Sequence, residues 1–72
     1  MIDTPNAQLQ AAIERRLLED PRTRNAIIDV ACLAGQVTLS GTVPTPAVKA
    51  AAEEIARSVP GVTLVINELI VR

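Results

Sequence analysis

The segment from Gln36 to Val43 alternates between two kinds of residue, and this alternation constrains the fold of the 72-residue chain more than any other feature. A period of two is typical of a β-strand with one buried and one solvated face. We therefore predict a strand over 36–43. One face carries Val37, Leu39, Gly41 and Val43, and the other carries Gln36, Thr38, Ser40 and Thr42.

A second strand is predicted over 27–34, because Ala26 to Ala34 is rich in β-branched residues. Gly35 is a turn residue between the two strands, so we expect a hairpin around Ala34-Gly35. Gly41 inside the following strand indicates a bulge or a close backbone contact.

Two helices are predicted, over 5–19 and 46–59, each with a Thr-Pro pair at its start. Threonine is a good capping residue and proline suits a first helical turn. Pro21 and Pro60-Gly61 end the two helices. The apolar stripes are Leu9, Ala12, Ile13 and Leu17 in the first, and Val48, Ala51, Ala52, Ile55, Ala56 and Val59 in the second.

The last predicted strand runs over 62–71, and both of its faces are largely apolar. The resulting order is αββαβ within a single domain, 1–72. We expect an α+β two-layer sandwich, with a three-stranded sheet and both helices on one face. A right-handed crossover through the second helix makes the third strand parallel to the second. The order of the strands in the sheet does not follow from this argument.

The composition excludes several kinds of chemistry. The chain has no aromatic residue, no histidine, a single cysteine and a net charge of −1. Aromatic platforms for stacked bases are therefore missing, and no strong field would attract nucleic acid. The sequence contains no metal-ligand cluster and no phosphate-binding glycine loop. We accordingly predict a protein that is not an enzyme, uses no cofactor and binds no nucleic acid.

Three segments follow one another along the chain: Ile28-Asp29-Val30, the run from Gly35 to Val43, and the run from Gly61 to Val71. Taken in order, they resemble the BON domain family of bacterial envelope proteins. The family pattern is an I-x-V strand, then G-x-V-x-L-x-G-x-V, a helix, and G-V-x-x-V-x-N-x-L-x-V. The resemblance covers essentially the whole chain and implies the αββαβ fold.

The resemblance also implies a function. BON domains occur in periplasmic, outer-membrane and osmotic-stress proteins, where they attach proteins to phospholipid membranes or mediate assembly. We therefore expect a non-enzymatic module for phospholipid-membrane association or cell-envelope assembly. The alternative is a protein–protein or self-association domain without lipid binding, and a homo-oligomer is one form this would take.

Four arginines near the end of the first helix are the candidate lipid-headgroup residues: Arg15, Arg16, Arg22 and Arg24. Each basic residue near an anionic surface contributes about 1 kcal/mol. Glu14, Glu19 and Asp20 lie among them, and basic residues there also complement a helix C-terminus. The same charges therefore fit either a lipid patch or an ordinary solvated helix end.

The outer face of the sheet holds the candidate interface residues: Ile27, Leu33, Leu64, Ile66 and Ile70. If the first and third strands are neighbours, these side chains form one contiguous apolar patch. Such a patch on a small domain fits either an interaction surface or an exposed sheet that the fold tolerates.

Two further expectations concern single positions. We expect Cys32 to be a buried small hydrophobe on the inner face of the first strand. The N-terminus starting at Met1 lacks the pattern of a signal peptide. We expect a cytoplasmic protein if Met1 is the natural start, and a periplasmic or envelope domain if the segment comes from a longer exported chain.

Overall fold

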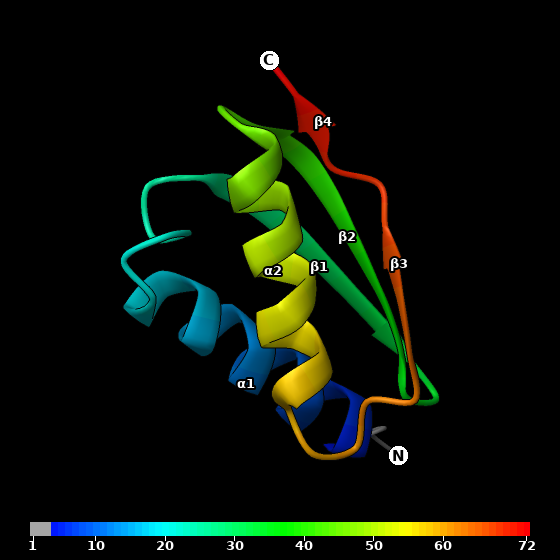
Figure 1. Ribbon diagram of the computed structural model, residues 1–72. Helices are drawn as coiled ribbons and strands as arrows, with labels where there is room; N and C mark the ends of the chain where they lie inside the picture. Colours follow the sequence, from blue (N-terminus) through cyan, green and yellow to red (C-terminus); the bar gives the residue numbers. More distant parts are fainter. Residues whose placement is uncertain (1–3) are drawn as a thin grey trace.

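The computed structural model describes residues 4–72, with side chains from residue 7 onward. The expectations for Met1 and for the capping side chain of Thr4 lie outside this description. Both helices cover the same face of the sheet (Figure 1), which confirms the predicted α+β fold. The elements are α1 (Thr4–Glu19), β1 (Ile27–Leu33), β2 (Gln36–Val43), α2 (Pro46–Ser58), β3 (Leu64–Asn67) and β4 (Ile70–Val71).

The sheet places β2 at its centre, which the sequence left undetermined. Strand β1 pairs with one edge of β2 in the antiparallel direction, and β3 and β4 pair in the parallel direction with the other edge. The predicted parallel direction of the last strand relative to β2 is confirmed. Because β2 carries the strictest alternation, its apolar face can lie at the middle of the core while its polar face lines the outside of the sheet.

The hairpin between β1 and β2 closes as predicted around Ala34 and Gly35. Leu33 lies opposite Gln36, so the connecting loop has two residues. Ala34 has φ of 53° and Gly35 has φ of 84°, the backbone of a type I′ turn. Glycine tolerates this left-handed region, but an alanine side chain is strained there.

Replacing Ala34 with asparagine is therefore expected to raise the free energy of unfolding by about 0.5–1 kcal/mol, because Asn-Gly suits a type I′ turn. Urea denaturation at neutral pH measures the change. Exposed Ala31, which lies within β1 and outside the turn, provides the control: Ala31→Asn should not stabilise the domain. Equal effects at the two positions would contradict the strain at Ala34.

The prediction of one continuous last strand is wrong, because the chain leaves the ladder between Asn67 and Ile70. The side chain of Asn67 explains the gap. Its carboxamide oxygen accepts a hydrogen bond from the backbone N–H of Leu69 at 3.1 Å, and its nitrogen donates to the Lys49 carbonyl of α2 at 3.0 Å. Strands β3 and β4 keep the same register along β2 on either side of this gap, so Leu69 still turns inward and is only 1% exposed.

Two threonine hydroxyls stabilise helix ends. The hydroxyl oxygen of Thr45 accepts a hydrogen bond from the N–H of Val48 at 3.2 Å, and Pro46 follows in the first turn of α2, as the sequence predicts. At the other helix, the hydroxyl of Thr23 donates to the Leu17 carbonyl at 2.6 Å. Thr23 is buried, so this bond provides a partner for a carbonyl that the end of α1 leaves without one.

The core lies between the helix pair and the inner face of the sheet. It contains only aliphatic side chains, and α2 contributes mainly alanines, which bring that helix close to the sheet. The buried core residues are Ile13, Leu17, Val30, Val37, Leu39, Val43, Ala52, Ile55, Ala56, Val59 and Leu69.

Candidate functional site

Three of the four candidate arginines, Arg15, Arg16 and Arg22, line a groove between α1, the loop that follows it and α2. The groove has a volume of about 740 Å³. Its charged lining is balanced, with three basic and three acidic side chains: Arg15, Arg16, Arg22, Glu19, Asp20 and Glu54. The groove as a whole is therefore not a strongly positive surface.

Arg22 is held by two carboxylates. Its guanidinium donates to both oxygens of Asp20, at 3.1 and 3.0 Å, and to Glu54 of α2 at 3.1 Å. The backbone N–H of Arg22 adds a bond to Asp20 at 2.8 Å. Side-chain hydrogen bonding with Asp20 raises the pKa of Arg22, and the same contact lowers the pKa of Asp20 below its usual value. Arg22 therefore joins the loop to α2 and has few donors left for a lipid phosphate.

The Asp20–Arg22 pair makes the free energy of unfolding depend on pH in the acidic range. The folded-state pKa of Asp20 lies below its ordinary value of 3.8. The contribution of the pair is therefore complete above about pH 4 and is lost as the pH falls through the folded-state pKa. We expect Asp20→Asn to lower the urea midpoint slightly near neutral pH, with the difference from the native chain shrinking in acid. A difference that grows on acidification would contradict this linkage.

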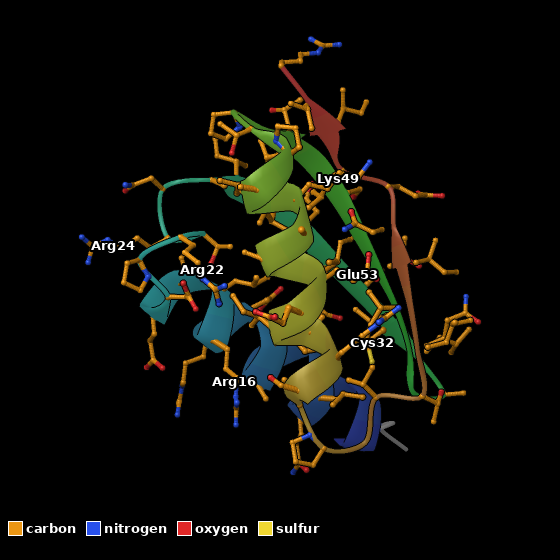
Figure 2. The ribbon with its side chains drawn as sticks, viewed as in Figure 1. Arg16, Arg22, Arg24, Cys32, Lys49 and Glu53 are labelled. Carbon is orange, nitrogen blue, oxygen red and sulfur yellow. The ribbon has the colours of Figure 1, made fainter. Side chains whose placement is uncertain are left out.

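The other three arginines are not held in this way. Among the residues that the structure describes, Arg15, Arg16 and Arg24 have no ion pair. Arg24 extends outward from the loop, whereas Arg16 extends from α1 in another direction (Figure 2). The structure does not bring the four arginines to a single point, and only Arg15, Arg16 and Arg22 line the same groove.

A second groove, largely apolar, lies at the end of the molecule where the hairpin turn meets the α2–β3 loop. Its volume is about 590 Å³. Among the residues that the structure describes, Arg16 is the only charged one in its lining; it also lines the charged groove, so it stands between the two. The apolar groove is lined by Gln8, Leu9, Ala12, Arg16, Ala34, Gly35, Val59, Pro60 and Gly61.

The outer face of the sheet does not carry one contiguous apolar patch, because β1 and β3 are not neighbours. The polar side of β2 runs between them, with Gln36 between Leu33 and Leu64, and Thr42 between Ile27 and Ile70. The candidate interface residues therefore form two separate rows. Ile27 and Leu33 are 80% and 72% exposed, Leu64 and Ile70 are 53% and 52% exposed, and Ile66 is half-buried.

Cys32 lies on the inner face of β1 and is half-buried, packed against the core rather than enclosed in it. No group of three or more potential metal ligands occurs within residues 4–72 that the structure places. Within that same span, neither helix is long and apolar enough to cross a bilayer.

Three features of this surface were not identified from the sequence. Glu54 reaches Arg22 across 32 positions of the chain, and no local pattern predicts such a pair. The apolar groove joins α1, the hairpin turn and the α2–β3 loop, which only the folded chain brings together. Leu18 could have been found, because it is an apolar residue outside the helical stripe, and it is 67% exposed.

Comparison with known proteins gives one finding. The family model described as BON domain matches residues 5–72, which is nearly the whole chain. Among curated proteins, no sequence matches closely enough to indicate a relative.

Proposed function

The chain belongs to the BON domain family, and from this premise we propose that it attaches to anionic phospholipid surfaces through the α1 side of the molecule. The family is known in membrane-associated and osmotic-stress proteins and is generally not catalytic. A binding module in the cell envelope therefore fits the family better than an enzyme does.

The position of Arg16 is the observation that supports this proposal most. A phospholipid has an anionic phosphate next to apolar chains, and a site for it needs a cation next to an apolar surface. Arg16 borders a groove lined by Leu9, Ala12 and Val59 on one side and the charged groove on the other. Arg15 comes from the same helix and adds a second cation to the charged groove.

Arg22 and Arg24 have different roles in this proposal. Arg22 is neutralised by Asp20 and Glu54 and stabilises the loop, so it contributes little to the attraction of a membrane. Arg24 lines neither groove. With a net charge of −1 and only a few exposed cations, binding should be weak and should decrease with salt.

Replacing both Arg15 and Arg16 with glutamine is expected to weaken binding to anionic liposomes roughly thirtyfold, at about 1 kcal/mol per arginine. Co-sedimentation with phosphatidylglycerol-containing vesicles, and with neutral vesicles for comparison, measures this at low and physiological salt. The chain should favour the anionic vesicles.

Two variants provide matched controls. Arg57→Gln removes an arginine that is paired with Glu53 at 2.8 Å on α2, and Arg22→Gln removes the neutralised arginine of the cluster. Both should retain most of the binding. If either control variant weakens vesicle binding as much as Arg16→Gln alone, the overall charge of the chain rather than this site is responsible for the binding. If the native chain binds neither kind of vesicle, the proposal is wrong.

The alternative function, assembly with protein partners without lipid contact, is supported by the exposed apolar side chains of the sheet. Ile27 and Leu33 of β1 are the most exposed large apolar residues that the structure describes. A solution mass above that of one chain, combined with no liposome binding, would favour this function.

A further inference from the structure

The most exposed apolar side chains lie along one edge of the sheet, formed by β1. Among the large apolar residues that the structure describes, the three most exposed are Ile27 (80%), Leu33 (72%) and Leu18 (67%). Ile27 and Leu33 are the two ends of β1. Leu18 belongs to α1, and it lines a small groove with Ile28 of β1 on the helix-bearing face. Both faces of the sheet are therefore apolar next to this edge.

The two edges of the sheet differ in their capacity to pair with another strand. The edge opposite β1 is divided into β3, with four residues, and β4, with two. Strand β1 is continuous over seven residues, with no proline or glycine and a single charge at Asp29. Short strands, breaks and charges normally protect a sheet edge from pairing, and β1 has little such protection.

The backbone of β1 also has hydrogen-bonding groups directed outward. In a hairpin with a two-residue loop, the closing pair, here Leu33 and Gln36, exchanges both hydrogen bonds. Along an antiparallel strand, residues that bond to the neighbouring strand alternate with residues whose backbone groups face away from it. Val30 is three residues before Leu33, so its N–H and C=O face away from β2. Within the described part of the chain, Ile28 and Val30 have no backbone hydrogen bond to any segment other than β2.

We propose that β1 pairs in the antiparallel direction with β1 of a second copy of this chain, with the two-fold axis at Val30. Antiparallel pairing about a two-fold axis keeps the helices of both copies on the same face and joins the two sheets into one. The two Val30 residues lie opposite each other and exchange their backbone hydrogen bonds.

The side chains select this register. With the axis at Val30, Ile27 lies opposite Leu33 of the second copy at each end, and Asp29 lies opposite Ala31. All seven residues of β1 then have a partner. Moving the axis to Asp29 would place two carboxylates opposite each other, which is unfavourable. Moving it to Ala31 would place Asp29 opposite Leu33 and shorten the pairing.

The outer-face position of Ala31 allows a charge test, because Ala31 is exposed and its substitution leaves the core intact. In the proposed register, Ala31→Lys places a lysine opposite Asp29 of the second copy at two symmetric positions, and Ala31→Glu places a glutamate there. We expect the dimer dissociation constant to fall about fivefold for lysine and to rise about fivefold for glutamate. Exposed Thr42 on β2 is the matched control, and Thr42→Glu should leave the constant unchanged.

Sedimentation equilibrium from about 10 μM to 1 mM, at low salt, measures the dissociation constants of the native chain and the three variants. The native chain should show a concentration-dependent dimer. A monomer over the whole range would overturn the proposal. Equal dissociation constants for Ala31→Lys and Ala31→Glu would also overturn the proposal, because the dimer interface would then lie elsewhere on the molecule.

A disulfide experiment tests the register itself. In a Cys32→Ala background, chains with Ile27→Cys are mixed with chains with Leu33→Cys under mild oxidation. The mixed disulfide dimer should form faster than either homodimer, because only the mixed pair is directly opposite. Homodimers that form equally fast would overturn the register. This edge does not include Arg15 or Arg16, so a failed liposome experiment and a failed dimer are independent results.

Discussion

Replacing Gly41 with alanine is expected to destabilise the domain by about 3–4 kcal/mol. Gly41 has φ of 125°, a region that residues with a side chain rarely adopt. A Cβ atom at this position would also overlap the carbonyl oxygen of Ile27, which is backbone of the neighbouring strand and cannot rotate away. The variant must therefore change both the conformation of β2 and its pairing with β1.

Gly61→Ala separates these two causes. Gly61 has φ of 100°, but a Cβ atom there would meet only the Leu9 side chain at 3.5 Å, an ordinary contact. The cost at Gly61 should therefore be that of the backbone conformation alone, about 1–2 kcal/mol. Urea denaturation of both variants provides the comparison. A loss at Gly41 no larger than the loss at Gly61 would show that the contact with Ile27 contributes nothing.

Truncating Leu39 to alanine is expected to cost about 3–4 kcal/mol. Leu39 is completely buried at the middle of the central strand, between Val30 of β1 and Asn67 of β3. The chain has no aromatic residue, so no large ring is present in the core to move into the cavity. The total stability of a domain this small is roughly 4–11 kcal/mol, so the variant should lose a large share of it.

Leu33→Ala makes the same chemical change where the side chain is 72% exposed. Its effect on the stability of the monomer should be within about 0.5 kcal/mol. Thermal and urea unfolding of both variants, at a concentration where the chain is monomeric, tests the contrast. Equal losses would mean that Leu39 does not lie in the core that the structure describes.

The surroundings of the candidate arginines could not be predicted from the sequence. Arg15, Arg16, Arg22 and Arg24 are close together in the sequence and suggest one patch. In the folded chain Glu54 of α2 helps to neutralise Arg22, and Arg24 lies outside both grooves. Pairing across 32 positions depends on how two helices pack, and no local pattern contains that information.

The proposed lipid site and the proposed dimer surface lie on different parts of the molecule. The first is at Arg16 and the apolar groove beside α1, and the second is the outer edge of β1. Both can therefore be occupied in the same protein. A dimer would present two copies of Arg16, which would strengthen membrane binding through avidity.

The sequence by itself determined the two helices, the β1–β2 hairpin and the order of helices and strands along the chain. Alternation from Gln36 to Val43, helical stripes ending at Pro21 and Pro60, and a turn at Gly35 are local patterns, and a local pattern reflects the geometry of one element. The parallel direction of the last strand followed from the helical crossover that connects it to the second strand.

Only the tertiary structure decided which strands are neighbours and which charges meet. Strand β2 lies between β1 and β3, so the apolar residues of the outer face are separated into two rows rather than one patch. Asn67 interrupts the last strand because its carboxamide bonds to both Leu69 and the Lys49 carbonyl of α2. These outcomes depend on contacts between residues far apart in the chain, whose energies are set by packing rather than by local preference.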